Sequence, residues 1–494
     1  MGGAALLHSH SGLPQPWLRP DRSDAPRVGG LHLQFGADAS SEVVVSWFTE
    51  APITNPRAML GMPGDGFGRT VQAETRTYRD GNSGIEVRVN HARITNLTPD
   101  TDYIYAAVHD GTSPQLGTVR TAPRGRSAFR FTSFGDQSTP TLNNLSGTSF
   151  TSDSRGSPAA GDMTAAVERM APLFNLVNGD LSYANLAADR IRTWSDWLEN
   201  NSRSARYRPW MPAAGNHENE LGNGPVGFGA YQTYFAVPDS GTDAELRGLW
   251  YAFTAGSVRV ISLNNDDICY QDGGNFYVRG YSGGSQKRWL ENELATARAD
   301  RGIDWVVVCM HQTAISTAMK SNGADLGIRQ DWLPLFDRYG VDLVVCGHEH
   351  HYERSYSVRG AAATDTLTPL PVDTRADLID TSRGTVHLVI GGGGTSIPSN
   401  RLLFDSPRCR VLTGVGDFDA ALGIKRPIYV EEDAPWSAFR DRENPYGFVV
   451  FDVDPGRAGG STSIAATYYA LRGPFGDVTP VDRLTLTRPR MDTV

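Results

Sequence analysis

Residues 343–350 read Leu-Val-Val-Cys-Gly-His-Glu-His, an apolar run followed by a glycine and two histidines. Four consecutive apolar residues of this kind predict a buried strand. Gly347 would let the backbone turn sharply where the strand ends. His348 and His350 are two positions apart, so an extended or turning backbone can direct both imidazoles into one site. The stretch therefore predicts a strand that delivers metal ligands at its carboxyl end.

Four more motifs of this kind follow apolar runs elsewhere in the chain. A glycine opens three of them and would allow the same sharp turn. Their carboxylate, amide and imidazole donors, without thiolates, suit zinc, manganese or iron better than calcium. Two metal ions about 3.5–4 Å apart need a shared bridging carboxylate and several further donors each. We therefore predict a binuclear metal site. The four motifs are Gly135-Asp136, Gly179-Asp180-Leu181-Ser182-Tyr183, Gly215-Asn216-His217-Glu218 and Cys309-Met310-His311.

Residues 127–485 are predicted to form an α/β domain with a sheet sandwich, because apolar strands alternate there with amphipathic helices. Loops at the carboxyl ends of such strands gather in one crevice, which is where the five motifs fall. The expected strands are 129–134, 174–178, 210–214, 258–263, 305–310, 343–346 and 386–390, and the expected helices are 163–171, 190–200, 286–299 and 330–339.

Residues 27–122 show a different pattern, that of an all-β sandwich. Short β-branched or alternating runs are separated by turn clusters, which predicts about seven strands. The segment 97–105, Leu-Thr-Pro-Asp-Thr-Asp-Tyr-Ile-Tyr, resembles the tyrosine-bearing corner of fibronectin type III domains. Such domains are most often spacers or binding modules, so we expect the chemistry to lie in the α/β domain.

Composition limits the possible partners. The formal net charge is −9 and the chain has no run of lysines or arginines, which argues against nucleic acid or an anionic membrane as the main partner. A small phosphorylated substrate remains compatible, because metal ions supply positive charge locally. No apolar stretch approaches the roughly 18 residues of a membrane span.

Residues 1–26 are predicted to lie outside both domains. They begin with a small apolar stretch and continue with Ser, His and Pro. This pattern indicates either the end of a signal peptide or a plain tether. The first interpretation predicts an exported protein, whether secreted, periplasmic or held in the cell envelope.

The five motifs in this order, behind a β-sandwich, resemble the purple acid phosphatases of the metallophosphoesterase superfamily. Tyr183, three residues after Asp180, is the feature that matches this family, and the resemblance spans residues 27–485. It implies an Fe(III) ion beside a divalent Fe, Zn or Mn ion, with Asp180 bridging the two. It further implies that Fe(III) is held by Asp136, Tyr183 and His350, and that the divalent ion is held by Asn216, His311 and His348.

His217 would face the substrate phosphate in such a site without being a ligand. We expect it to bind a phosphoryl oxygen and protonate the leaving group, with Glu218 ordering its ring. The implied activity is that of an acid phosphatase, in which a metal-bound hydroxide attacks a phosphomonoester. Two alternatives stay open: a binuclear phosphodiesterase of the same superfamily, and an exported binding protein that uses the β-sandwich.

The chain departs from the family in the loop after His311. Plant and animal relatives carry further substrate-contacting histidines there, whereas this chain has none between His311 and His348. Lys320, Gln312 or a residue of the stretch 264–267 could take their place. The natural substrate, the divalent ion and the oligomeric state stay open.

Two cysteines and two further histidines are not expected to bind metal. Cys269 and Cys409 lie in polar stretches and could pair in an oxidising compartment. His387 lies in an apolar run and is expected to be a core residue. His351 is expected to point away from His350, because neighbouring residues of an extended chain face opposite sides.

Overall fold

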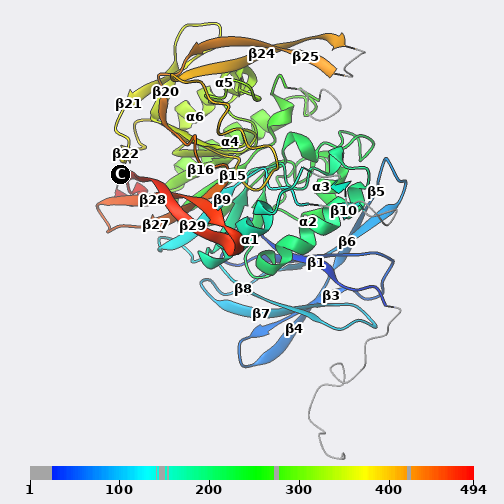
Figure 1. Cartoon of the computed structure of the whole chain (residues 1–494). Helices are drawn as coiled ribbons and strands as arrows, with labels where there is room; N and C mark the ends of the chain where they lie inside the picture. The colour runs from blue at the N-terminus through cyan, green and yellow to red at the C-terminus, as the bar shows by residue number, and fades with distance from the viewer. Residues whose placement is uncertain are drawn as a thin grey trace, which may run out of the picture.

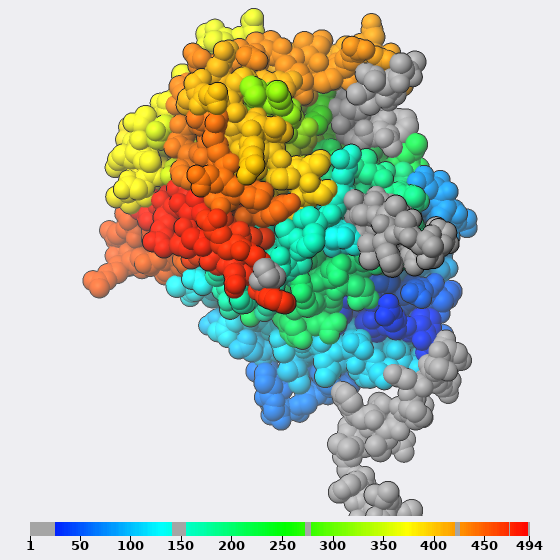
Figure 2. Space-filling view, in the orientation of Figure 1, coloured from blue at the N-terminus to red at the C-terminus, as the bar shows by residue number. Residues whose placement is uncertain are grey.

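The computed structural model describes residues 25–140, 142–143, 151–152, 155–271, 278–419 and 424–493. Figure 1 shows a small β domain, coloured blue to cyan, below a larger domain built on two sheets. In the space-filling view of Figure 2 the two domains are in direct contact. Of the predicted tether, residues 1–24 lie outside the described residues.

The small domain is a sandwich of two four-stranded sheets, ordered β1-β2-β6-β5 and β4-β3-β7-β8. It therefore has eight strands where about seven were expected. The Thr98 backbone N–H donates to Tyr103 Oη at 2.9 Å, which is the contact that a tyrosine corner makes. The strands are β1 (Gly29–Phe35), β2 (Val43–Thr49), β3 (Arg57–Met62), β4 (Gly66–Gln72), β5 (Glu74–Arg79), β6 (Glu86–Ile94), β7 (Asp102–Val108) and β8 (Gln115–Arg120).

The sandwich is held against the larger domain through α2 (Arg190–Ala205). Ser202 Oγ donates to the Leu31 carbonyl of β1 at 2.7 Å. Tyr105 Oη donates to the Arg206 carbonyl, just past the end of α2, at 2.7 Å. Because both contacts use buried or half-buried side chains and backbone carbonyls, they fix one orientation of the sandwich.

Two seven-stranded sheets form the larger domain. The first has the order β13-β12-β9-β27-β28-β29-β22, and the second has the order β14-β15-β16-β18-β23-β19-β26. The predicted fold, an all-β sandwich followed by an α/β sheet sandwich, is confirmed. The strands are β9 (Phe129–Phe134), β12 (Phe174–Val177), β13 (Trp210–Pro212), β14 (Tyr251–Ala255), β15 (Val258–Ser262), β16 (Trp305–Cys309), β18 (Leu343–Cys346), β19 (Tyr352–Ser355), β22 (Leu378–Asp380), β23 (Val386–Ile390), β26 (Ser437–Arg440), β27 (Gly447–Asp454), β28 (Ser461–Gly473) and β29 (Asp477–Pro489).

Helices and shorter sheets complete the domain. None of the helices in the described part of the chain has the length and apolar character needed to cross a bilayer. The other helices are α1 (Ala159–Arg169), α3 (Gly229–Tyr234), α4 (Ser285–Ala299), α5 (Leu326–Asp331) and α6 (Leu333–Tyr339). The smaller sheets contain β10 (Leu142–Asn143), β11 (Thr151–Ser152), β17 (Ala324–Asp325), β20 (Ser357–Ala361), β21 (Pro369–Asp373), β24 (Arg408–Asp419) and β25 (Ile424–Asp433).

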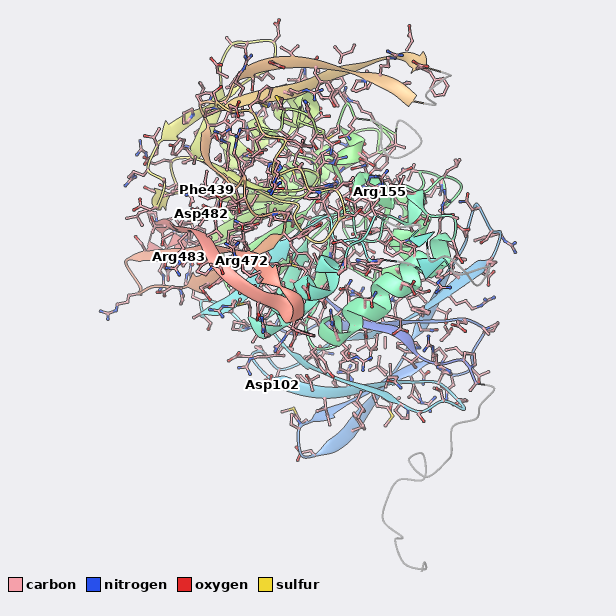
Figure 3. All side chains as sticks on the ribbon, viewed as in Figure 1. Asp102, Arg155, Phe439, Arg472, Asp482 and Arg483 are labelled. Carbon is pink, nitrogen blue, oxygen red and sulfur yellow. The ribbon has the colours of Figure 1, made fainter. Side chains whose placement is uncertain are left out.

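The two large sheets are joined by a buried ion pair. Arg354 of β19 donates from Nε to Asp482 Oδ2 of β29 at 2.6 Å, and Tyr352 Oη donates to the same oxygen at 2.9 Å. Figure 3 labels Asp482 beside Phe439 of β26, over whose ring the Arg354 guanidinium also lies. Tyr352 and Arg354 therefore have a structural role.

Two expectations about secondary structure are wrong. The helix expected at 330–339 is split into α5 and α6 around Trp332. Pro334 in the first turn of α6 has no N–H to donate to the Gln330 carbonyl, so one continuous helix cannot form. Seven strands of the two large sheets were missed, namely β14, β19, β22, β26 and β27 to β29, and β29 runs to Pro489, beyond the predicted domain end at 485. β28 alternates buried and exposed residues, whereas the expected strands were continuous apolar runs.

The cysteines are all free, and Cys269 and Cys409 are both buried. Cys409 lies on β24 rather than in a polar loop, and Arg329 Nη2 donates to its Sγ at 3.6 Å. His387 lies buried on β23, as expected. His351 is also buried, with Nε2 2.9 Å from Glu353 Oε1, so it packs structurally beside the ligands.

Candidate metal centre

The five motifs all lie at the carboxyl ends of parallel strands. In the first sheet β9, β12 and β13 run parallel, and in the second sheet β15, β16, β18 and β23 do. The carboxyl ends of parallel strands open at one edge of a sheet, so each sheet delivers its loops to a common crevice. The first sheet supplies Asp136, Asp180, Tyr183 and Asn216, and the second supplies His311, His348 and His350.

One group of donor atoms forms around Tyr183. Its Oη lies 3.2 Å from Asp136 Oδ1 and 3.1 Å from His350 Nε2. His350 Nε2 in turn lies 3.3 Å from Asp136 Oδ1. Three potential ligand atoms, a carboxylate oxygen, a phenol oxygen and an imidazole nitrogen, therefore converge on one position.

A second group forms around His311 Nε2. This atom lies 3.1 Å from Asn216 Oδ1, 3.1 Å from Asp180 Oδ2 and 3.2 Å from His348 Nδ1. Ligand atoms of Asp180, His311 and His348 all lie within 4.8 Å of one another, which allows them to bind one ion. The structure thus divides the seven predicted ligands into two groups and places Asp180 in the second.

Backbone carbonyls orient two of the imidazoles. His311 Nδ1 lies 2.7 Å from the Asn178 carbonyl, and His350 Nδ1 lies 2.8 Å from the Ile397 carbonyl. Because a carbonyl only accepts, each Nδ1 carries the proton and each Nε2 keeps its lone pair for a metal. His348 is different: its Nδ1 faces His311, and its buried Nε2 has no hydrogen-bond partner among the described residues.

The charge at the site fits bound cations. Asp136 and Asp180 are buried, and no arginine or lysine of the described chain pairs with either carboxylate. Burial alone would raise the pKa of Asp180, but His311 and His217 hold it below its ordinary value. Burial raises the pKa of Tyr183 well above its usual range, and Asp136 adds to this, so the phenol needs a metal ion to ionise. Buried carboxylates without ionic partners are costly, and metal ions would compensate them.

Several ligands adopt the left-handed backbone conformation that side chains disfavour. The φ angles are 56° at Asp136, 51° at Asp180, 59° at Tyr183 and 72° at His348. Residues held in this region cost about 1–3 kcal/mol each and are concentrated at functional sites. The strain therefore lies on the ligands themselves.

The glycines before the ligands have a different role from the expected one. Of the four, Gly179 has a positive φ, whereas Gly135, Gly215 and Gly347 do not. A Cβ atom on Gly215 would lie 2.3 Å from Asp180 Oδ1, and one on Gly347 would lie 2.4 Å from Asp136 Oδ2. The prediction that these glycines provide sharp turns is wrong for three of them. Gly215 and Gly347 instead leave room for the two carboxylates.

Glu218 connects the loops after β12 and β13. Its carboxylate accepts from the backbone N–H groups of Asp180, Leu181 and Gly215, each at 2.8 Å. Burial, with the nearby Asp180 carboxylate, raises the pKa of Glu218 to about 8. Glu218 therefore positions Asp180. The expectation that Glu218 orders the His217 ring is wrong, because its carboxylate is taken up by these backbone N–H groups.

Asn185 is the residue that orders His217. Its Oδ1 lies 2.9 Å from His217 Nδ1, so Nδ1 carries the proton. The Tyr183 ring also packs against the His217 ring, with 4.5 Å between ring centroids. His217 Nε2 is 3.9 Å from Asp180 Oδ2, and the ring lines the cavity above the ligands. Burial lowers the pKa of His217, whereas the nearby Asp180 carboxylate acts to raise it. Sequence reasoning missed Asn185, whose one signal was its position two residues after Tyr183.

The cavity above the ligands has a volume of about 580 Å³. Lys320 lines it, as one of the expected replacements for the absent histidines. Gln312 does not: it is buried, and its Nε2 donates to Asp266. Arg155, which the sequence analysis did not consider, also lines the cavity.

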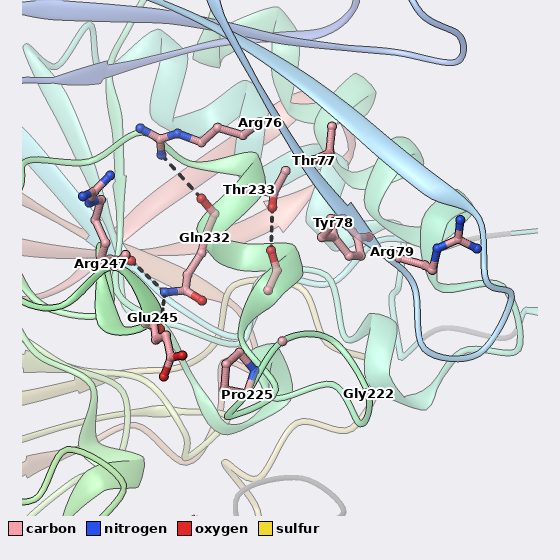
Figure 4. Close-up of a pocket in the computed structure, with 13 residues that line it drawn as sticks. Arg76, Thr77, Tyr78, Arg79, Gly222, Pro225, Gln232, Thr233, Glu245 and Arg247 are labelled. Carbon is pink, nitrogen blue, oxygen red and sulfur yellow. Dashed lines mark hydrogen bonds between the residues drawn. The ribbon is translucent and has the colours of Figure 1, made fainter.

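A second cavity of about 530 Å³ lies between β5 and α3. Figure 4 shows its arginines, among them Arg76, which donates to the Gln232 carbonyl at 3.5 Å. The lining residues include none of the seven predicted ligands, and the arginines bond to backbone or to neighbouring carboxylates. This cavity is therefore separate from the candidate metal centre.

Comparison with known proteins agrees with this geometry. Residues 28–121 match the model of the purple acid phosphatase N-terminal domain, and residues 158–352 match that of the calcineurin-like phosphoesterases. The second range contains six of the seven predicted ligands and begins after Asp136.

Several proteins are similar over much of the chain. An uncharacterised protein of Mycobacterium tuberculosis is 73% identical over 489 residues, which is 99% of this chain and 92% of that protein. The Fe(3+)-Zn(2+) purple acid phosphatase 12 of Arabidopsis thaliana is 26% identical over 380 residues, 74% of this chain and 72% of that protein. The structure of purple acid phosphatase PPD1 from yellow lupin seeds superposes with a TM-score of 0.68 at 20% identity, covering 95% of this chain and 75% of that one. With both domains matched in order, this chain belongs to the purple acid phosphatase family of metallophosphoesterases.

Proposed function

We propose that this chain is an acid phosphatase that hydrolyses phosphomonoesters at a centre of Fe(III) and one divalent ion. The observation that carries this proposal is the division of the ligands into two groups, of which only the group around Tyr183 contains a phenol. A phenol oxygen in one group alone suits two chemically different ions, because ligand type is a main determinant of metal selectivity. The name of the Arabidopsis relative, an Fe(3+)-Zn(2+) enzyme, agrees with such a pair.

The proposed ligand roles follow from the two groups. Asp180 is assigned as the bridging carboxylate, because its Oδ2 lies in the second group and its charge also acts on Tyr183 and His350 of the first group. A bound pair of ions would supply Lewis-acid activation of the phosphoryl group and of the attacking water. Fe(III) is assigned to Asp136, Tyr183 and His350, and a divalent Fe, Zn or Mn ion to Asn216, His311 and His348.

His217 is the proposed general acid. Its Nδ1 is held by Asn185, so Nε2 is the nitrogen that can meet a substrate in the cavity. When protonated, Nε2 can donate to a phosphoryl oxygen and then to the oxygen of the leaving alcohol. Proton transfer from a positioned group of this kind contributes about 10²–10⁴-fold.

Hydrolysis of 4-nitrophenyl phosphate and of bis(4-nitrophenyl) phosphate by the metal-loaded protein tests the proposal. We expect the monoester to have the higher kcat/KM. A higher kcat/KM for the diester would instead support the phosphodiesterase. Two bound metals without hydrolysis of either ester would favour the binding-protein alternative.

We also propose that the natural protein is exported. The support is the apolar stretch at residues 2–7 and the Ser/His/Pro-rich segment that follows it. Fractionation of cells that express the complete gene would test this. Protein found only in the cytoplasm would contradict export.

A further inference from the structure

The cavity above the proposed metal centre has an outer part with a distinct lining. Two cations, Arg155 and Lys320, and three large apolar side chains, Leu186, Ile397 and Leu402, line it. We infer that this outer part is a leaving-group subsite for phosphomonoesters of an apolar alcohol that carries a second negative charge. The inference rests on the proposed phosphatase function and adds the substrate class.

The two cations flank one loop, residues 396–402. At its start, the Ser396 N–H donates to the Arg155 carbonyl at 2.6 Å. At its end, the N–H of Met319, next to Lys320, donates to the Leu402 carbonyl at 2.6 Å. Figure 3 shows Arg155 above α2, in the region between that helix and the β24–β25 hairpin. Backbone contacts therefore hold both cations at the rim of the cavity.

Among the residues that the structure describes, neither cation is neutralised by a neighbour. Within the described ranges, Arg155 and Lys320 form no ion pair, and Asp180 is the one carboxylate that lines the cavity. Asp180 is already assigned to the metal ions. Hydrogen bonds from cations to anions are roughly twice as strong as neutral ones. Two unpaired cations beside a phosphate site are therefore suited to a second anionic group on the substrate.

The three large apolar side chains form a rim around the cavity and are unusually exposed for residues of their kind. Leu186 is 42% exposed, Ile397 is 47% exposed and Leu402 is 36% exposed, and all three lie around this one cavity. Burying apolar surface stabilises a complex by roughly 25 cal/mol per Å². Exposed apolar side chains gathered at a cavity are typical of ligand sites. An aromatic or aliphatic leaving group would cover them.

The apolar rim lies next to His217, the proposed general acid. This position assigns the rim to the leaving group. Leu186 directly follows Asn185, which orients the His217 ring. Ile397 is anchored to a ligand, because its carbonyl accepts from His350 Nδ1 at 2.8 Å. The proposed general acid thus lies on the wall that carries Leu186. An alcohol that receives its proton from His217 therefore leaves past Leu186 into the part of the cavity that Ile397 and Leu402 also line.

Four substrates distinguish the contribution of the two cations from that of the apolar side chains. Glycerol 2-phosphate has a polar uncharged leaving group and phenyl phosphate an apolar uncharged one. 3-Phosphoglycerate adds a carboxylate to the polar frame, and 4-carboxyphenyl phosphate adds it to the apolar frame. Each variant is compared with the wild type on the same substrate, so differences in leaving-group acidity cancel. The variants are Arg155→Gln, Lys320→Gln, Ile397→Ser and Leu402→Ser. The charge-matched control is Arg288→Gln, because Arg288 is an exposed residue of α4.

Removing either cation should lower kcat/KM for the two carboxylate-bearing esters about tenfold relative to their uncharged counterparts. Removing an apolar side chain should lower it for the two aryl esters about fivefold relative to the glycerol-based ones. Arg288→Gln should change none of these ratios. Equal losses on all four esters in the subsite variants would overturn the inference.

Binding of phosphonates gives a readout that does not depend on turnover. Calorimetry with 4-phosphonobenzoate and phenylphosphonate on the metal-loaded protein should show tighter binding of the first, and Arg155→Gln should abolish that preference. Equal affinities in the wild type would overturn the inference while phenyl phosphate hydrolysis still upheld the proposed function. If the loaded protein hydrolyses none of the four esters, the proposed function fails first, and the leaving-group subsite fails with it.

Discussion

Replacing Gly215 by alanine tests how closely the ligands of the proposed centre are packed. A Cβ atom there would lie 2.3 Å from Asp180 Oδ1, 2.5 Å from the Asp180 backbone nitrogen and 2.9 Å from His311 Cγ. The φ angle of Gly215 is −98°, which alanine adopts without strain. The effect of the substitution therefore comes from these contacts and not from the backbone.

The size of the effect follows from the distances. Ordinary contacts of a Cβ atom begin at 3.4 Å, so the Asp180 carboxylate must move by about 1 Å. A misplacement of that size at a reacting centre costs about 10²-fold in rate. Overpacking of a buried site also destabilises a fold by about 1–3 kcal/mol. We expect kcat to fall about 100-fold and the metal content to drop below two ions per chain.

The assay combines kcat on 4-nitrophenyl phosphate, metal content by mass spectrometry and thermal unfolding. Gly414→Ala on β24 is the control, because a Cβ atom at Gly414 meets nothing within 4 Å. A Gly215→Ala protein with two metal ions and nearly the wild-type kcat would refute the reasoning. A fall in Tm with unchanged kcat would show that the contact matters for stability alone.

Three further predictions concern single residues. Asp180→Asn should reduce the metal content to one ion or none, and two ions retained per chain would contradict the bridging role. Asn185→Ala removes the hydrogen bond that orients His217, worth about 1 kcal/mol, so hydrolysis of esters with poor leaving groups should fall about fivefold. An identical loss on good and poor leaving groups would argue against a role in protonation. Burial lowers the pKa of His387 to about 3, so protonation favours the unfolded chain as pH falls below about 6.5. The free energy of unfolding should therefore lose about 1.4 kcal/mol per pH unit from this residue between pH 6 and 4, a slope that His387→Gln removes. Equal slopes in denaturant titrations of both proteins would refute the assignment.

Most of the metal ligands could be predicted because two independent signals coincide at them, whereas Tyr183 was assigned through the family resemblance alone. An apolar run locates the end of a strand, and a donor side chain directly after it provides a ligand. Asp136, Asp180 and His311 carry both signals, and the structure brings them together as expected. Parallel strands then guarantee that residues far apart in the chain meet at one edge.

The residues around the ligands lack such signals. Asn185 lies in a 3-10 helix of three residues and Arg155 in an irregular segment. Neither has a periodicity that locates its side chain, and their contacts depend on how two distant loops pack. Glu218 was noticed, but its partners are backbone N–H groups of two loops, which a sequence does not reveal. Side-chain chemistry can be read from the sequence, whereas hydrogen bonds to the backbone of another loop cannot.

The glycines show where the usual explanation fails. Gly347 precedes His348, and the sequence analysis gave it the role of a turn. In the structure His348 itself takes the left-handed conformation, with φ at 72°, and Gly347 leaves room for the Asp136 carboxylate. Whether a glycine provides a turn or space depends on what lies against it.

The visible absorption spectrum of the purified protein, measured beside its metal content, tests the central claim most directly. Tyr183 Oη lies 3.1 Å from His350 Nε2 and 3.2 Å from Asp136 Oδ1, so an Fe(III) ion held by these three side chains would be bound by a phenolate. We predict a broad charge-transfer band, nearly two metal ions per chain including iron, and loss of the band in Tyr183→Phe. A colourless protein that holds two zinc or manganese ions would contradict the Fe(III)–tyrosinate centre.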